Sequence, residues 1–577
     1  MGAASRAASD QAGVVAGLWN AGGRNVPESN IWTGALLWRV AHLYPDAPAA
    51  DAWRDRAHDY FVNGVSVPAD AHAATVAGGR SIAARHVGAN FFPNYALDHH
   101  GYLNVGYMVI CVSNAAILHF DMRQAGLPRP ETLDHHQAEL WALVRRMVFD
   151  DGRLIRIGGD SRVRYAYCQE YLLPALLYAA DHLQDSHAPA LADAQVDLML
   201  AEVDDDGAFY GRRLAHLRDG NPHYYTRLES DRACVLAMLL NYLPLVATPP
   251  APRATLAAST AGGWSEPEHG AVFHRSATRF ASFAWRAYGL TQALCLPPAE
   301  SSLAEWHANL CPVVRFLGDD GRQPGAHRRL LRYTLHEFDG GFATCGAVME
   351  GVDVPVDEGA RCTDQATTHI AFVALPDART CVGMQYVVAA PDRVGMLAEL
   401  KGLHLNVPND LFNGHRRTIR STGGEHVLDA PAPQDETIHL GSRKLTVDDA
   451  LTVALAYGGD GLCVDRSAQR RGGRYGSLLV EEICTTAQSC ITSVQPGQTL
   501  LDLGFVVRTG VDVPDAAARV IAAEGATVRA LIVTGADGVQ YGVGANFGAA
   551  PAQVELLGVS VMIAPSAVVV IAPGGIL

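Results

Sequence analysis

The segment Asn94–Tyr107 reads NYALDHHGYLNVGY and leads directly into Val105–Phe120, a stretch that is largely apolar. Such a stretch predicts a helix that is buried on all sides. Within fourteen positions, the segment holds two adjacent histidines, one aspartate, two asparagines and three tyrosines. A rigid buried helix holds a polar cluster at its start in one geometry, as a reactive site requires. The segment therefore predicts a helical domain and the core of an active site.

The same residues also allow a purely structural interpretation. Aspartate is a good N-cap residue, so Asp98 could begin the helix while His99 and His100 form local hydrogen bonds. Both interpretations stay open from these residues alone.

Length and charge narrow the class of protein. A chain of 577 residues is too long for one ordinary core, so we expect at least two domains. Hydrophobic content of 49% and charged content of 18% are typical of a folded globular protein. The net charge of −15 argues against a general nucleic-acid binder, which normally has a basic face. An anionic ligand would therefore need a local cationic pocket.

Cysteine usage and the N-terminus bear on location. The eleven cysteines include no C-x-x-C pair, which favours a reducing compartment and gives no metal-binding pattern. Met1–Ala16 has no continuous apolar core, so the sequence as written predicts a cytoplasmic protein. It would be secreted or periplasmic if a leader had preceded this segment. No run reaches the roughly 18 to 20 uninterrupted apolar residues of a membrane helix. We expect no membrane partner, metal or cofactor.

Helical periodicity dominates the first 250 residues, with loops rich in Gly, Pro and Asp between the helices. Helices are predicted over Ile31–Tyr44, Ala50–Phe61, Val105–Phe120, Pro130–Phe149, Tyr165–Gln184, Pro189–Val203 and Ser230–Leu245. Several of these are apolar all round, which favours inner and outer layers of helical hairpins over a four-helix bundle.

The pattern changes after the proline-rich segment Pro249–Pro252, which predicts a domain boundary. Strands are predicted over Ala271–His274, Phe280–Ala287, Thr368–Leu375, Thr380–Val388, Leu451–Tyr457, Ser477–Glu482, Thr499–Thr509, Thr527–Thr534, Val554–Leu557 and Val568–Ile571. Many short strands with Gly and Asp-Gly turns predict a large antiparallel β-sandwich. The fold class is thus multidomain α+β, with a helical domain over 1–250 and a β-sandwich over 251–577.

The sequence resembles polysaccharide lyases of the heparinase II/III type. Three segments carry the resemblance: Glu28–Trp32, Asn94–Tyr107, and Asp151–Gly152 followed by Arg162–Tyr167. The resemblance implies an incomplete (α/α) toroid followed by a β-sandwich, and a catalytic tyrosine in the third segment. The sandwich of such enzymes often holds a structural zinc in a D-H-x-H-D-like segment. The nearest segment here, Asp364–His369, lacks most of it, which implies a divergent branch and no metal.

A lyase of this kind removes the C5 proton of a uronic acid and expels the sugar linked at O4. The reaction needs a group that neutralises the carboxylate, a base for the proton and an acid for the leaving oxygen. We expect His100 to be the base, with His99 as the alternative, because a neutral imidazole can accept a proton near pH 7. We expect Tyr167 to be the acid, with Tyr165 second.

Substrate-binding residues are expected among side chains that suit a carboxylate or a sugar ring. These are Asn94, Asn104, Arg162, Arg164, His223, Tyr225 and Arg227, and His99 could also neutralise the carboxylate. Ordinary packing is the alternative for the tyrosines. For the cluster Pro222–Asp231, the alternative is a helix cap formed by Ser230 or Asp231, with the aromatic residues anchoring a loop.

Three functions remain in competition at this stage. The leading hypothesis is a lyase that acts on a uronic-acid glycan, such as one containing glucuronate, and forms a 4,5-unsaturated product. A glycoside hydrolase would need two suitably spaced carboxylates, for which Asp98, Asp151, Asp160, Glu170, Glu229 and Asp231 are available. A non-catalytic carbohydrate-binding protein is the third. The His, Tyr and Arg grouping favours the lyase, with an acidic glycan as partner and no indication of oligomeric state.

Overall fold

The computed structural model describes residues 14, 26–159, 166–304, 309–319, 327–356, 359–471, 478–485, 490–511, 518–522 and 527–577. Among these residues the chain divides into two compact units. Unit 1 contains those up to 156 and from 166 to 256, and unit 2 contains 157–159 and those from 257 onward. Helices make up most of unit 1 and antiparallel strands most of unit 2, which is the predicted α+β class.

Unit 1 is built mainly from helices, with two very short hairpins. The helices are α2 (Pro27–Leu43), α3 (Ala50–Val62), η1 (Pro68–His72), α4 (Ile82–Arg85), α5 (Val105–Ala125), η2 (Glu131–Asp134), α6 (Gln137–Arg145), α7 (Ala166–Glu170), α8 (Leu172–Asp181), α9 (Ala188–Ala201), α10 (Gly211–Leu214), α11 (Leu217–Gly220), α12 (Pro222–Tyr242), η3 (Leu243–Leu245) and η4 (Arg253–Thr255), and α13 (Leu256–Thr260) follows at the boundary. The hairpins are β1 (Val76–Ala77) with β2 (Arg80–Ser81), and β3 (Asp98–His99) with β4 (Tyr102–Leu103).

Helix α5 is the core of unit 1, as the apolar run predicts. Its first turn is capped by Asn104, whose side chain accepts a hydrogen bond from the backbone amide of Tyr107 at 3.2 Å. It ends at Gly126, whose φ of 63° is the left-handed conformation common after helices. The helix is long and apolar enough to cross a membrane, but 89% of its apolar window is buried within the protein. It packs against α2, α6 and α8, so it is a core helix.

Two predicted helices are interrupted in the structure. The predicted helix Pro130–Phe149 consists of η2 and α6, because His136 between them has a φ of 56°, which no continuous helix accommodates. The predicted helix Tyr165–Gln184 is divided at Tyr171 into α7 and α8.

Helix α12 begins well before the predicted start at Ser230. Asn221 caps it by accepting a hydrogen bond from the amide of Tyr224 at 3.2 Å, and Pro222 occupies the first turn. The hydroxyl of Ser230 instead donates to the carbonyl of Thr226 at 2.9 Å inside the helix. The prediction that Ser230 or Asp231 caps this helix is therefore wrong.

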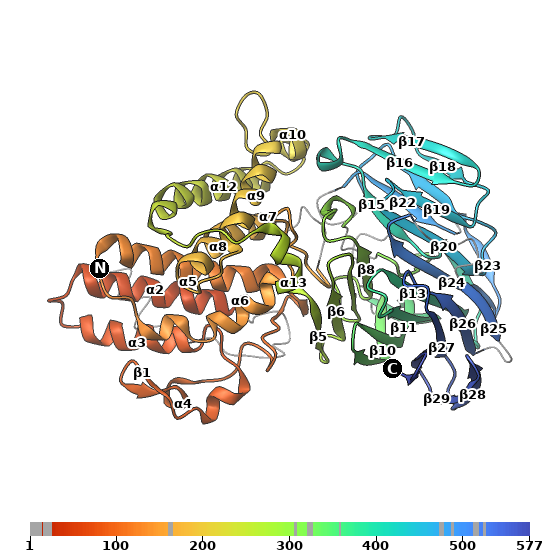
Figure 1. The fold of residues 1–577 in the computed structure, drawn as a ribbon, viewed down its shortest axis with the longest axis horizontal. Coiled ribbons are helices and arrows are strands. Elements are labelled where there is room, and N and C mark those ends of the chain that lie inside the picture. The colour runs from red at the N-terminus through yellow and green to blue at the C-terminus, as the bar shows by residue number, and fades with distance from the viewer. Residues whose placement is uncertain are drawn as a thin grey trace. The chain divides into compact units, whose positions relative to one another are not determined.

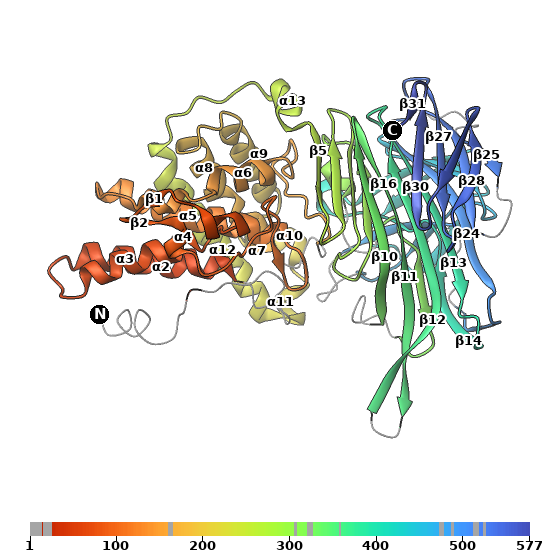
Figure 2. The same ribbon diagram turned by 90° about the horizontal axis from the view of Figure 1, so that it is seen from below.

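Unit 2 is built around a nine-stranded antiparallel sheet. Its strands in spatial order are β10 (Arg328–Phe338), β11 (Gly341–Val356), β12 (Gly359–Ala374), β13 (Thr380–Ala389), β24 (Thr499–Thr509), β20 (Leu451–Tyr457), β19 (Lys444–Val447), β16 (Arg416–Ser421) and β17 (Gly424–Asp429). Figure 2 shows the long hairpin of β11 and β12 extending beyond its neighbours.

Smaller antiparallel sheets accompany it. They are β5 (Gly262–Glu266), β6 (Ala271–Arg275), β7 (Phe280–Ala284) and β8 (Gln292–Leu296); β25 (Ala518–Ala522), β26 (Val528–Thr534), β27 (Gln540–Asn546), β30 (Ala567–Ala572) and β31 (Gly575–Ile576); β15 (Leu405–Pro408), β22 (Val480–Cys484), β21 (Cys463–Arg466) and β18 (Glu436–His439); β23 (Thr492–Val494), β14 (Gly395–Lys401) and β9 (Val313–Phe316); and β28 (Ala552–Leu556) with β29 (Val559–Ile563).

Both faces of the central strands of the large sheet are buried. Cys345 and Val373 belong to one core with Val543 of β27, a strand of the five-stranded sheet. Phe372, the neighbour of Val373, points to the opposite face, where its ring centroid lies 5.8 Å from that of Phe283 in β7. Alternate residues of one strand therefore serve two cores, as the two-residue period of a strand requires. This burial on both faces explains why the predicted strands are nearly continuous apolar runs.

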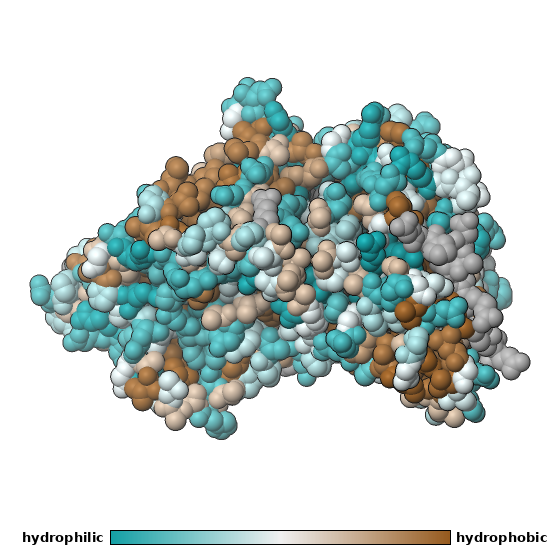
Figure 3. All heavy atoms as spheres, viewed as in Figure 1, coloured by the Kyte–Doolittle hydropathy of each residue, from teal (hydrophilic) through white to brown (hydrophobic). Residues whose placement is uncertain are grey.

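Several strands that the sequence did not predict are polar, such as β16, β17 and β18. Strand β10, at the edge of the large sheet, alternates between partly buried and exposed residues over RRLLRYTLHEF. Charged edge strands of this kind oppose pairing with other chains. Figure 3 shows that polar residues cover most of one face, with apolar patches over α12 and over β28 and β29.

Candidate active site

The predicted polar segment folds as a hairpin that ends at the start of α5. His100 and Gly101 form its turn with φ values of 64° and 83°, as a two-residue type I′ turn requires. The hairpin places the two histidines in different surroundings. His99 is only 2% exposed, whereas His100 is exposed at the tip. Asn104 caps α5, and its amide also donates to the carbonyl of His99 at 3.4 Å. The alternative interpretation of Asp98 as the helix cap is therefore wrong.

The imidazoles of this hairpin gather around Tyr107 in the first turn of α5. The ring of His99 stacks on that of Tyr107, with centroids 3.8 Å apart and planes inclined by 14°. The ring of His100 meets His99 edge-on at 4.1 Å and Tyr107 at 5.8 Å. On α2, Glu28 Oε1 lies 3.8 Å from His99 Nε2. Neither ring nitrogen of His99 has a hydrogen-bond partner among the described residues.

A second phenol lies against Tyr107. The hydroxyl of Tyr167, on α7, donates a hydrogen bond to the hydroxyl of Tyr107 at 2.8 Å. Burial raises the pKa of Tyr167 far above its usual value, and the opposing effect of Arg227 is smaller. The Tyr167 phenol therefore keeps its proton at neutral pH.

Helix α12 supplies a cation to the same group. The guanidinium carbon of Arg227 lies 4.1 Å from the ring centroid of Tyr167, within the range of a cation–π contact. The Arg227 side chain is 51% exposed, and its Nε lies 3.5 Å from Asp231 Oδ2. Burial raises the pKa of Asp231, whose other oxygen accepts a hydrogen bond from Tyr171 at 3.3 Å. Arg227 is thus only partly neutralised and can meet an anion.

The other predicted binding residues have different positions. His223 is exposed one helical turn before Arg227, so it lies on the same side of α12. Tyr225 is buried beneath Arg218, whose guanidinium carbon is 5.3 Å from its ring, and this contact anchors α11 to α12. Asn94 is partly buried in the loop before the hairpin, where its Oδ1 accepts a hydrogen bond from the amide of Ala96 at 3.3 Å.

Three predicted site residues, Arg162, Arg164 and Tyr165, lie outside the described residues. Two residues that the sequence analysis did not assign to the site, Tyr107 and Glu28, are part of it. Tyr107 could have been found from its place in the first turn of a buried helix that follows the histidine pair. Glu28 could have been found only within the resembling segment Glu28–Trp32.

Several carboxylates considered for a hydrolase have structural partners. Glu170 pairs with Arg232 at 2.7 Å and accepts a hydrogen bond from Tyr210 at 2.5 Å, with all three residues buried. Glu229 accepts hydrogen bonds from the amides of Phe209 and Tyr210, both at 3.0 Å. These interactions hold α7 and α12 in place and leave Glu170 and Glu229 poorly placed for acid catalysis.

Asp151 and Asp160 belong to the same set of carboxylates. Asp151 accepts a hydrogen bond from the amide of Arg153 in a turn, at 3.1 Å. Asp160 lies outside the described residues.

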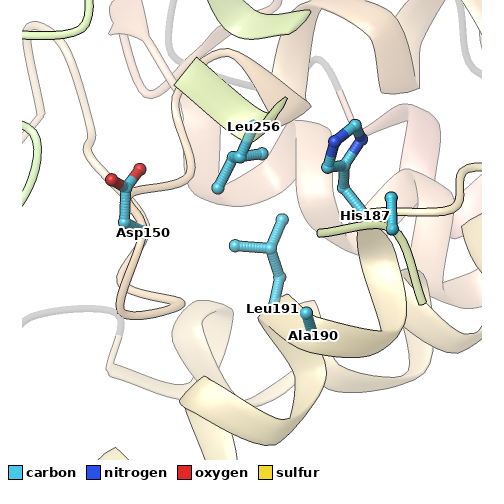
Figure 4. A pocket seen from close by; sticks show the side chains of 6 residues that line it. Asp150, His187, Ala190, Leu191 and Leu256 are labelled. Carbon is cyan, nitrogen blue, oxygen red and sulfur yellow. The ribbon is translucent and has the colours of Figure 1, made fainter. Parts of the chain in front are cut away.

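A small hollow elsewhere in unit 1 is lined by Asp150, His187, Ala190, Leu191, Ala251 and Leu256 (Figure 4). Apolar side chains separate Asp150 from His187 in this view. The ring of His187 is held by Thr255 Oγ1 at 2.9 Å from Nε2 and by Arg145 at 3.2 Å from Nδ1. The two titratable side chains that line the hollow are therefore kept apart, and the imidazole of His187 is engaged by Thr255 and Arg145.

Comparison with known proteins gives similarity only at the level of solved structures. No family model matches the chain, and no curated protein matches it. The chondroitin AC lyase of Streptomyces coelicolor A3, solved as a mutant, matches 94% of this chain and 75% of its own at 11% identity, with a TM-score of 0.42. The heparan sulfate lyase HepC of Pedobacter heparinus matches 95% of this chain and 84% of its own at 8% identity, with a TM-score of 0.28.

A part of the chain is also similar to the galactosidase domain of the alpha-galactosidase-sucrose kinase AgaSK. This match covers 43% of this chain and 42% of that chain at 8% identity, with a TM-score of 0.28. The chondroitin AC lyase and the heparan sulfate lyase HepC thus each match nearly the whole of this chain.

Proposed function

We propose that this chain is a polysaccharide or oligosaccharide lyase that cleaves a uronic-acid glycan by β-elimination. The observation that supports this most strongly is the phenol pair of Tyr107 and Tyr167, which has imidazoles on one side and Arg227 on the other. Such a grouping suits proton abstraction next to a carboxylate, and it does not need the paired acids of a hydrolase. We propose an incomplete (α/α) toroid for the helical unit and a glucuronate-containing glycan as substrate.

The carboxylate of the substrate must be neutralised before its C5 proton becomes acidic. Arg227 is half-exposed, and its guanidinium carries a positive charge at any pH at which the protein is folded. Its positive charge would stabilise the enolate that develops in the transition state. Asn94 and His223 would add hydrogen bonds to the sugar. Arg162 and Arg164 remain proposed as further carboxylate-binding residues.

The base proposed for the C5 proton is His100. Its exposed position at the hairpin tip allows contact with a substrate, whereas His99 is buried behind it. In this arrangement His99 positions His100 and Tyr107 through ring contacts, and it is the alternative base. A neutral imidazole takes up the proton and becomes positively charged.

The acid proposed for the leaving oxygen is the pair of phenols of Tyr107 and Tyr167. As the C5–H electrons form the C4=C5 double bond, the C4–O4 bond breaks, and Tyr107 donates its proton to the leaving oxygen. Tyr167 then returns a proton to Tyr107 through their hydrogen bond of 2.8 Å. Finally, His100 releases the abstracted proton to solvent and the Tyr167 phenolate takes up one proton from solvent, which restores the starting state. Tyr165 remains the second candidate for the acid.

The experiment is product analysis on a panel of uronic-acid glycans with the full-length protein. Elimination gives fragments whose masses sum to that of the substrate and a new ultraviolet absorbance from the double bond, whereas hydrolysis adds one water. A matched control substrate has its uronic acids reduced to neutral sugars, which removes the acidity at C5. We expect no cleavage of the reduced substrate. Saturated products, or equal cleavage of both substrates, would contradict the proposal.

A further inference from the structure

Away from the tyrosine pair, unit 1 contains a cluster of two imidazoles and one carboxylate. His135 Nε2 lies 3.0 Å from Asp70 Oδ2, and His136 Nε2 lies 3.0 Å from Asp70 Oδ1. The three donor atoms all lie within 4.8 Å of one another. The Asp70 side chain is only 4% exposed, and those of His135 and His136 are 12% and 19% exposed. The cluster is therefore a nearly enclosed set of nitrogen and oxygen ligands.

The backbone is held in an unusual conformation to form this cluster. His136 has a φ of 56°, in the left-handed region that few residues other than glycine adopt. Adjacent residues normally point apart, but here both rings reach the same carboxylate, with centroids 4.0 Å apart. Strain of this kind persists where the surrounding structure enforces it, and it is concentrated at functional sites.

The outer contacts of the cluster suit metal coordination. The Nδ1 atom of His136 lies 3.3 Å from the hydroxyl of Tyr95 and 3.9 Å from Glu139 Oε1, which orients the ring so that Nε2 faces Asp70. Histidine ligands commonly donate their second ring proton to such a partner. Asp70 Oδ2 also accepts a hydrogen bond from the amide of Val67 at 2.9 Å, which fixes the carboxylate.

The donor types of the cluster are also appropriate. The carboxylate of Asp70 offers two oxygen atoms, and each of them lies 3.0 Å from an imidazole nitrogen. Two histidines and one carboxylate are the ligands of several zinc sites that keep a further position for water.

We propose that Asp70, His135 and His136 bind one divalent transition-metal ion, with Zn²⁺ as the expected ion. Coordination would connect η1 to the segment between η2 and α6, which lies more than 60 positions further along the chain. It would also fix Tyr95, the neighbour of Asn94. The ion would thus stabilise unit 1 and the loop before the hairpin, without taking part in the proton transfers at Tyr107.

The test uses the full-length protein freed of metal by a chelator and then titrated with Zn²⁺ or Co²⁺. A Cys362→Ser background removes a second, more exposed group formed by His327, Asp353 and Cys362. We expect calorimetry to show one zinc ion bound per chain and a rise in Tm with zinc concentration. Cobalt should give visible bands of nitrogen and oxygen coordination without a thiolate band.

Substitutions of the proposed ligands and of an outer contact should weaken zinc binding to different degrees. His135→Gln and His136→Gln should each weaken zinc binding by more than about 100-fold, and Tyr95→Phe, which alters an outer contact, by about tenfold. His72→Gln, an exposed histidine on η1, is the control and should bind as the parent does. If a variant does not fold, the cobalt spectrum of the parent protein decides the question. No zinc binding by the parent, or unchanged binding in both histidine variants, would overturn the proposal.

Discussion

At the scale of single residues, the relation between Tyr107 and Tyr167 is the feature on which the proposed chemistry depends. The two hydroxyls are joined at 2.8 Å, and burial keeps the proton on Tyr167. In the proposed mechanism, the inner phenol of Tyr167 serves as a proton reserve for that of Tyr107. The two tyrosines would act together in one proton transfer. Removing either hydroxyl should therefore lower turnover nearly as much as removing both.

Tyr167→Phe tests this prediction. We expect turnover to fall by about 10²- to 10⁴-fold, as for the loss of a general acid, because the ring and its contact with Arg227 are retained but the proton is lost. The rate is measured from the ultraviolet absorbance of the unsaturated product. Tyr242→Phe removes another buried phenol hydroxyl, on a ring that stacks on Phe120, and should leave the rate unchanged. A Tyr167→Phe enzyme of wild-type rate would remove Tyr167 from the mechanism.

His100→Asn tests the proposed base without straining the turn. Asparagine tolerates the φ of 64° at this position, whereas alanine would add backbone strain to the loss of the imidazole. We expect a loss of turnover of about 10²- to 10⁴-fold with an unchanged Tm. His72→Asn is the control for loss of an exposed histidine. Activity that survives in His100→Asn but not in His99→Asn would transfer the role of base to His99.

At the scale of secondary structure elements, the site depends on the close approach of α5 and α7. Gly106 lies next to Tyr107 on α5, and a Cβ atom added there would lie 2.8 Å from Sγ and 3.0 Å from Cβ of Cys168. Cys168 follows Tyr167 on α7 and is fully buried. The absence of a side chain at Gly106 therefore allows the helices that bear the two tyrosines to approach each other.

Gly106→Ala should separate these helices. We expect the free energy of unfolding to fall by about 1–3 kcal/mol, the usual cost of overpacking, and activity to fall because the hydrogen bond between the tyrosines lengthens. Urea denaturation measures the stability, and product absorbance measures the activity. Gly220→Ala in α11 is the matched control, since an added Cβ meets no atom within 4 Å, and it should be neutral or slightly stabilising. Equal stability of the two variants would contradict this packing argument.

At the scale of the whole molecule, each unit has its own core, and the core of unit 2 contains a buried histidine. His369 on β12 packs beside the rings of Tyr386 and Phe547, with centroids 5.8 Å and 5.6 Å away. Burial, with a smaller contribution from Arg332, lowers the pKa of His369 from 6.5 to about 4. The folded protein therefore holds this imidazole neutral where an unfolded chain would protonate it.

This buried imidazole predicts how acid affects unit 2. Because the unfolded state binds the proton more tightly, the contribution of His369 to stability is complete above pH 6.5 and is lost as the pH falls towards 4. The loss is about 3 kcal/mol. His369→Phe keeps an aromatic ring at this position but has no titratable group. The free energy of unfolding, measured with urea at several pH values, should therefore fall by about 3 kcal/mol less in this variant on acidification. His439→Gln, at an exposed position on β18, should leave the acid dependence as it is, and an unchanged dependence in His369→Phe would refute the assignment.

Sequence by itself determined the nature of the elements. The apolar run at Val105 became a buried helix, and the run Thr499–Thr509 became a strand with those bounds, because hydrophobic periodicity is a local property of a sequence. It also placed His99, His100 and Tyr167 among the candidates for one site. The positions at which elements begin and end were harder to predict from the sequence. The start of α12, for example, depends on a single side-chain cap at Asn221.

Tertiary structure decided which of these side chains meet. Tyr107 and Tyr167 are 60 positions apart, and their hydrogen bond exists because α5 and α7 approach closely at Gly106. The hairpin turn buries His99 and exposes His100, although the two are chemically identical neighbours. Asp70 likewise meets His136 only through the fold. Contacts between distant residues depend on how whole elements pack, and no local pattern in the sequence specifies that packing.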